Sequence, residues 1–231
     1  MLKPVAIMMG LAIVAAAATS ADAAMYAVTI DNLVAGGPAT GQPFSPPVAV
    51  VHDGSYAEFE PGTFASPGLA LCAREGDPSM LSSEASAASG VMSVVVGTGP
   101  YFDTQTITVM GNPGDLLSIA WMLGRTNDCF SGIHDVLLPA TGEMDLYTGA
   151  WDAGVEVNTG LAMDIPFYGG HGVGPDEHNP IADITSFTVH DDPTYGKISW
   201  QFPPVTHVHI SVMGPSASEP TVWGELKTLF R

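Results

Sequence analysis

Basic residues are scarce in this chain. Its 231 residues hold six Lys and Arg against 24 Asp and Glu, which gives a formal net charge of −18 at pH 7. Nucleic acids and anionic membrane surfaces are bound by clustered Lys and Arg, and no such cluster occurs here. The sequence therefore argues against both as partners. An acidic surface attracts cations, but only a specific geometry turns that attraction into a binding site.

Long apolar runs are also lacking. The longest covers residues 5–18; it follows Lys3 and precedes Ala21-Asp22-Ala23, a small-x-small cleavage pattern. A helix needs about 20 apolar residues to cross a bilayer, and nothing later in the chain supplies them. We therefore expect residues 1–23 to be a signal peptide, with an uncleaved anchor as the alternative. The mature protein is expected to be exported, to the periplasm or the cell exterior, with no membrane insertion after cleavage.

Cysteine is almost absent. Cys72 and Cys129 are the two in the chain, and an oxidising compartment would permit one disulfide between them. Sequence alone does not establish that bond, because bridging requires Cα atoms within about 7 Å, and two buried free thiols are the alternative. Neither cysteine has an activating local context, and no Gly-x-Ser-x-Gly segment occurs. The sequence thus offers no evident nucleophile for covalent catalysis.

Alternating and continuous apolar segments predict β-strands along nearly the whole chain, separated by turns rich in Gly, Pro, Asn and Asp. We expect one all-β domain, an antiparallel β-sandwich over residues 24–190, with residues 191–231 adding strands to it. Short helices are expected at residues 67–73 and 78–88, the second capped by Asp77. The predicted strands are residues 26–30, 48–51, 91–96, 104–110, 116–123, 136–138, 181–190, 197–202 and 205–212.

Several ordered blocks between about residues 26 and 190 resemble bacterial members of the spondin-domain family, the family of the F-spondin N-terminal domain. They include YAVTIDNL, GQPFSPPV, TNDCFSG, WDAGVE and NPIADIT, which begin at residues 26, 41, 126, 151 and 179. The resemblance implies an extracellular, non-enzymatic β-sandwich, a variant of the C2 fold, with a calcium site at one end. The family's calcium ligands carry over to Asp128, Asp152 and Glu156. A further family position reads Gly132-Ile133-His134 here, with Asp135 one place later.

The chemistry of these carboxylates points the same way. Calcium takes six to eight oxygen ligands at about 2.3–2.6 Å from carboxylates, carbonyls and water. Gly154 would let the chain turn back so that Asp152 and Glu156 converge on one ion. Three carboxylates held together would repel one another without a cation, and Arg125 is the basic residue of this segment. The alternative is that Asp128 and Asp152 are turn residues and Glu156 is solvated.

Histidines suggest a second hypothesis. His207 and His209 alternate on a predicted strand, so both side chains face one side, a spacing used in copper and zinc sites. His171, His178 or His190 could complete such a site, although surface or hydrogen-bonded histidines are the simpler interpretation. A glycoside hydrolase is less favoured, because Asp and Glu four residues apart in one loop converge more readily on a cation than across a cleft.

The sequence therefore predicts an exported, monomeric, non-enzymatic adhesion or surface-recognition module. Its cofactor would be Ca2+, bound by Asp128, Asp152 and Glu156, and its partner an extracellular or cell-surface macromolecule. The alternative is a copper- or zinc-dependent exported oxidoreductase that uses His207 and His209. A structural envelope protein without bound metal is the third hypothesis. The glycine-rich residues 169–175 are expected to be a loop, and they lack the Lys-Ser/Thr of a phosphate-binding loop.

Overall fold

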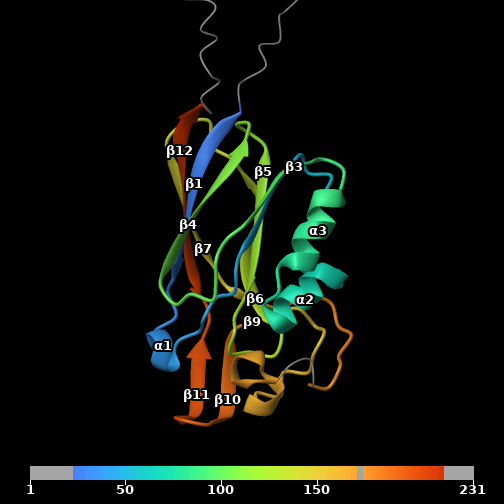
Figure 1. Cartoon of the computed structure of the whole chain (residues 1–231), viewed down its shortest axis with the longest axis vertical. Coiled ribbons are helices and arrows are strands. Elements are labelled where there is room, and N and C mark those ends of the chain that lie inside the picture. The colour runs from blue at the N-terminus through green and yellow to red at the C-terminus, as the bar shows by residue number, and fades with distance from the viewer. Residues whose placement is uncertain (1–22, 171–173, 216–231) are drawn as a thin grey trace, which may run out of the picture.

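A computed structural model describes residues 23–170 and 174–215 and confirms the all-β antiparallel sandwich (Figure 1). One sheet has four strands, in the order β4 (Thr104–Gly111), β1 (Ala24–Asn32), β12 (Thr206–Pro215) and β7 (Glu143–Thr148). The other has six, in the order β3 (Val91–Val96), β2 (Val48–His52), β5 (Leu116–Met122), β6 (Cys129–Leu137), β8 (Ala150–Asp152) and β9 (Ala182–Ile184). A hairpin of β10 (Ser186–Asp192) and β11 (Gly196–Gln201) extends from one end.

The six-stranded sheet is buried on both faces, which explains why β2 reads as an unbroken apolar run. Ala49 and Val51 point into the core between the two sheets, whereas Val48 and Val50 point to the opposite face. That face is covered by two helices, α2 (Pro67–Glu75) and α3 (Ser79–Ala87). Strands covered on both sides lose the alternation of apolar and polar residues that half-buried strands keep.

The helices begin close to the predicted positions. Ser66 caps α2 by accepting a hydrogen bond from the Leu69 backbone N–H at 3.1 Å. At α3 the expected cap is wrong by one residue, because Pro78 occupies the cap position while Asp77 accepts from the Ser79 N–H. Short helical turns not expected from the sequence are α1 (Gly37–Thr40), η1 (Ala162–Asp164) and η2 (Pro166–Tyr168).

The two cysteines are free and buried, so the disulfide considered from the sequence is not formed. Cys129 lies in the core between the sheets, and Cys72 lies in the core beneath the helices. The six-stranded sheet contributes to both clusters and lies between them. Each thiol therefore packs as a small side chain in its own core, and the Cys129 thiol also donates to the Asn158 Oδ1 at 3.6 Å.

The segment after residue 190 is integral to the sandwich. β12 pairs with β1 on one side and with β7 on the other, so it is an inner strand of its sheet. Residues 1–22, the expected signal peptide apart from Ala23, lie outside the described residues, as do residues 171–173 of the expected glycine-rich loop. None of the helices in the described ranges has the length and hydropathy of a membrane span.

Candidate metal centre

Strand pairing brings Asp128 and Asp152 together. Cys129, the first residue of β6, pairs with Asp152, the last residue of β8. The Ala153 N–H donates to the Asp128 carbonyl at 3.2 Å, which continues the ladder past the strand ends. Two aspartates that are 24 residues apart in sequence thus lie at the same end of the six-stranded sheet, close enough for their charges to interact.

The turn after β8 depends on Gly154. Its φ of +68° lies in the left-handed region, which L side chains rarely adopt. A Cβ at this position would also meet the Asn179 carbonyl oxygen at 2.3 Å. The Asp152 Oδ1 accepts a hydrogen bond from the Gly154 N–H at 2.8 Å and fixes the start of the turn. The turn directs the following backbone N–H groups toward Asp128.

Asp128 is fully buried, and only one of its two carboxylate oxygens accepts hydrogen bonds. Its Oδ2 accepts hydrogen bonds from the backbone N–H groups of Val155 and Glu156, at 2.8 and 3.0 Å. Its Oδ1 is buried with no hydrogen-bond partner among the described residues. A buried carboxylate oxygen without a partner is costly, because water no longer solvates its charge. This oxygen is therefore available to a ligand.

The electrostatics of the pair disfavour two negative charges. Burial raises the pKa of Asp128 to about 7, and the neighbouring Asp152 carboxylate acts in the same direction. The two backbone N–H donors oppose this increase but do not cancel it. A cation placed against Asp128 would compensate both the lost hydration and the repulsion.

Glu156 lies in the same loop, but its side chain is paired elsewhere. It is buried, and its Oε1 lies 2.9 Å from a guanidinium nitrogen of Arg74 at the end of α2. Burial raises the pKa of Glu156, and the Arg74 charge opposes that increase. Sequence reasoning missed Arg74 because it lies in a helix distant in the chain, with no motif to link it to the carboxylates.

The expectation that Arg125 is the basic residue of the carboxylate loop is wrong. Its guanidinium donates to the carbonyl oxygens of Ala39 and Pro38, at 2.7 and 3.0 Å, and stacks 4.4 Å from the centroid of the Phe167 ring. Arg125 therefore contacts both α1 and η2, and Arg74 supplies the positive charge near Glu156.

Polar residues of the adjoining loop complete the surroundings. Asn158 donates from its amide to the Asp152 Oδ2 at 2.6 Å. Thr159 donates to the buried Asp164 at 2.7 Å, and Asn127 accepts from the Gly160 N–H at 3.2 Å. The sequence signal for this network is the run Val157-Asn158-Thr159-Gly160, which is typical of a polar loop and does not by itself indicate a site.

The three predicted ligands are thus only partly assembled. In the described ranges, no three or more His, Cys, Asp or Glu side chains already surround a position for a metal ion. Asp128 and Asp152 fit a hard cation, because one buried oxygen lacks a partner and the donors are carboxylates. Glu156 would first have to leave Arg74. Asp135 does not belong to this group: it lies near the other end of β6, 3.6 Å from His52.

The histidines lie apart from this centre. His207 and His209 are on β12 in the other sheet, where they contact acidic side chains. His178 stacks on Phe64 with ring centroids 4.4 Å apart. His190 lies in β10, and His171 is outside the described residues. His207 and His209 lie near each other, with ring centroids 6.4 Å apart, but in the described ranges no third histidine completes a metal site with them.

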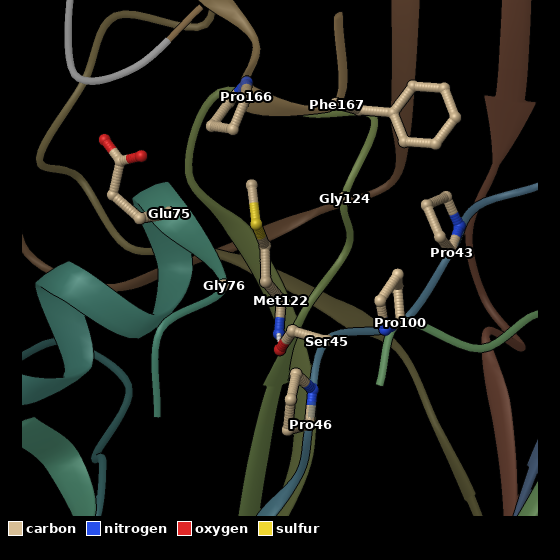
Figure 2. A pocket seen from close by; sticks show the side chains of 10 residues that line it. All are labelled: Pro43, Ser45, Pro46, Glu75, Gly76, Pro100, Met122, Gly124, Pro166 and Phe167. Carbon is tan, nitrogen blue, oxygen red and sulfur yellow. Dashed lines mark hydrogen bonds between the residues drawn. The ribbon is translucent and has the colours of Figure 1, made fainter. Parts of the chain in front are cut away.

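An apolar pocket of about 220 Å³ opens beside the turn between β5 and β6. Figure 2 shows its walls, in which four of the ten lining residues are prolines and Phe167 and Met122 add apolar surface. Its serine, Ser45, already accepts a hydrogen bond from the Met122 N–H at 2.8 Å. The pocket therefore suits an apolar group better than a polar substrate. The lining residues are Pro43, Ser45, Pro46, Glu75, Gly76, Pro100, Met122, Gly124, Pro166 and Phe167.

The chain matches no protein-family model, and no curated protein matches it.

Proposed function

We propose that this protein is an exported, monomeric, non-enzymatic recognition module whose end loops are ordered by one calcium ion. The observation that carries the proposal is the Asp128 Oδ1, a buried carboxylate oxygen without a hydrogen-bond partner beside a second carboxylate. Asp128 and Asp152 would hold the ion. Glu156 would join them on release from Arg74.

Calcium is favoured over other metal ions by the donor set. Asp128 and Asp152 offer carboxylate oxygens, and the nearby loop offers amide oxygens and backbone carbonyls, which are the ligands of a hard cation. The one sulfur close by, on Cys129, is buried, and burial raises the pKa of its thiol well above the usual range. Burial thus disfavours the thiolate that soft metals require.

Recognition is supported by exposed apolar side chains on the loops around this centre. Large apolar residues that face solvent on neighbouring loops commonly mark an interaction surface. The loop after Glu156 and the loop around Gly62 both carry such residues. The backbone N–H of Gly62 donates to the Ile181 carbonyl at 2.8 Å, which joins the second loop to the segment before β9. The exposed residues are Phe64, Val157, Leu161, Met163 and Phe167.

Calcium titration followed by thermal unfolding tests the proposal. At about 100 times its Kd, a ligand of the folded state adds about 2.7 kcal/mol, which raises the Tm of a chain this size by about 5–10 °C. Asp152→Asn should abolish most of that increase. Because it removes a repulsion from Asp128, it should also leave the calcium-free protein at least as stable as the wild type.

Asp183→Asn is the matched control. Asp183 is exposed on β9, opposite Trp151 in the ladder, so the charge change is the same and the site is left intact. Its calcium response should equal that of the wild type. If calcium leaves the Tm of the wild type unchanged, or if Asp152→Asn responds as fully as Asp183→Asn, the proposed calcium site is wrong.

A further inference from the structure

The outer face of the four-stranded sheet carries a second cluster of ionisable side chains, remote from Asp128. His207 on β12 is directly opposite Asp31 on β1, and His209 is directly opposite Asp145 on β7. Directly opposed residues on adjacent strands have Cβ atoms about 4.5–5.5 Å apart, so their side chains can meet. All four side chains are partly exposed.

Two imidazoles converge on one carboxylate oxygen in this cluster. The Asp145 Oδ1 lies 2.8 Å from the His207 Nε2 and 2.8 Å from the His209 Nδ1. The remaining nitrogen of His209 lies 3.7 Å from a Glu143 carboxylate oxygen. Two ring nitrogens and a carboxylate oxygen thus form a compact group that solvent can reach.

His207 has a carboxylate oxygen at each of its ring nitrogens. Its Nδ1 lies 2.9 Å from the Asp31 Oδ2, and its Nε2 lies 2.8 Å from Asp145. A neutral imidazole has only one N–H, so one nitrogen would direct its lone pair at a carboxylate oxygen. The arrangement therefore requires a positive charge, either a second proton on the ring or a metal ion between Nε2 and Asp145.

Asp31 has the properties of a residue that orients a metal-binding histidine. It accepts a hydrogen bond from the Thr104 hydroxyl at 2.7 Å, so its carboxylate is held in place toward the His207 Nδ1. Histidines that bind metals almost always donate their other N–H to such a carboxylate, which fixes the tautomer and turns the free nitrogen toward the ion. Here the nitrogen left for an ion is Nε2, the one that faces Asp145.

We propose that this sheet face binds one divalent transition-metal ion, of the class of Zn2+, through His207, His209 and Asp145. Imidazole nitrogen with carboxylate oxygen suits zinc or copper and not calcium, which prefers oxygen alone. Water would provide the fourth ligand, because Glu143 lies at the other ring nitrogen of His209, the one that points away from the ion. Redox catalysis is not part of the proposal, because an open sheet face does not shield a reactive intermediate from water.

The described side chains are not yet in the geometry of a metal site, but the two distances to Asp145 differ little from those that zinc requires. Donor atoms around a tetrahedral zinc ion, each at about 2.0–2.1 Å from it, lie about 3.3 Å from one another. The observed separations of 2.8 Å are hydrogen-bond distances, which the cluster adopts without an ion. Asp145 is half exposed and can swing outward by the required half ångström or so, because solvent and not packed core lies beyond it.

Titration calorimetry with Zn2+ on the untagged protein tests the proposal. We expect one equivalent to bind to the wild type, and His209→Gln and His207→Gln each to weaken it by at least about tenfold. Asp31→Asn, which removes only the orienting carboxylate, should weaken it by about tenfold or less, the lower end of the range for such partners. His190→Gln is the matched control and should bind as the wild type does.

A second readout separates a built site from loose surface binding. Co2+ bound by the wild type in place of Zn2+ should give a visible absorption band that is absent in the double variant His207→Gln/His209→Gln. Equal Zn2+ affinity in that double variant, or a wild-type Kd weaker than about 1 mM, would overturn the site. Asp152→Asn should leave Zn2+ binding intact. The zinc proposal and the calcium proposal can therefore fail independently of each other.

Discussion

Two clusters in this protein each contain two aspartates, yet they differ in burial. Asp128 is fully buried, with one carboxylate oxygen lacking a partner. Asp31 and Asp145 lie on an open sheet face and accept hydrogen bonds from imidazoles and a hydroxyl. The number of acidic residues is similar, so that number alone does not determine how strongly a cluster requires a cation. Burial and the supply of donors determine it.

The difference has an energetic consequence. Removing a partner from a buried charge leaves it without either water or a counter-charge, which costs several kcal/mol. Removing a partner from an exposed charge lets water take its place, and the cost is small and screened by salt. Substitutions around Asp128 and Glu156 should therefore affect stability far more than substitutions around His207.

The largest effect is expected from Arg74→Gln. It leaves the buried Glu156 carboxylate without its ion-pair partner, which we expect to lower the free energy of unfolding by about 3 kcal/mol in the absence of calcium. The loss is placed at the lower end of the range for buried pairs because Arg74 is partly exposed. Urea unfolding at pH 7 measures it.

Arg74→Gln also tests whether Glu156 competes between Arg74 and calcium. Once freed from Arg74, Glu156 can join Asp128 and Asp152, so calcium should stabilise this variant more than it stabilises the wild type. The double variant Arg74→Gln/Glu156→Gln should recover much of the lost stability without calcium, and the exposed Lys197→Gln should match the wild type. If Lys197→Gln lowers the free energy of unfolding as much as Arg74→Gln does, burial of the Glu156 carboxylate is not the cause of the lost stability.

Gly154→Ala should have the next largest effect, about 2 kcal/mol, because a positive φ and a contact with the Asn179 carbonyl both oppose a Cβ. Gly196 is the matched control: its φ of +73° is similar, but a Cβ there would meet nothing within 4 Å. Gly196→Ala should cost only about 1 kcal/mol, the part due to backbone conformation. Equal losses in thermal unfolding would mean that the turn around Gly154 relaxes to avoid the contact.

The sequence predicted the sandwich because most strands carry apolar runs bounded by Gly and Pro. It missed most of β6, where Ser131, Gly132 and His134 interrupt the apolar pattern. The reason is packing of the backbone, since a Cβ at Gly132 would meet the Ile119 carbonyl oxygen at 1.9 Å. Only a glycine allows β5 to approach so closely, and a pattern of hydrophobicity does not report on that contact.

The candidate site was predictable only in part, for a similar reason. Asp128, Asp152 and Glu156 stand in short motifs, and strand pairing brings the first two together. The Arg74–Glu156 ion pair depends on where α2 packs against the loop, and the Asp31–His207–Asp145 contacts depend on the register of three strands. Such long-range contacts leave no local pattern in the residues that form them.

Glu58 allows burial to be separated from mutual repulsion, because it is a buried carboxylate whose pKa is raised by burial alone. Both of its oxygens lack a hydrogen-bond partner among the described residues, and burial raises its pKa well above the usual range. Below the ordinary pKa of 4.5, both the folded and unfolded states hold the proton. As the pH rises from there toward the raised folded pKa, only the unfolded state ionises, so stability falls.

The slope of that fall is about 1.4 kcal/mol per pH unit at most for one proton, and Glu58→Gln should remove it. Urea unfolding of the wild type and of Glu58→Gln between pH 5 and pH 8 measures the difference in slope, with the exposed Glu60→Gln as the control. Parallel curves for wild type and Glu58→Gln would mean that Glu58 reaches water or a counter-charge, and that burial alone does not raise its pKa.

The smallest effect is expected from Asp31→Asn, on the open sheet face. Although Asp31 accepts hydrogen bonds from both His207 and Thr104, it is partly exposed, so water replaces the lost charge interaction. The free energy of unfolding should fall by less than about 1 kcal/mol, and the loss should shrink as salt is added. Thr29→Ala provides a control on the same strand, since it removes a neutral hydrogen bond to Thr106 and its effect should not depend on salt. A loss for Asp31→Asn as large as that for Arg74→Gln would contradict the rule drawn from the two clusters, because it would mean that pairing matters more than burial even where solvent has access.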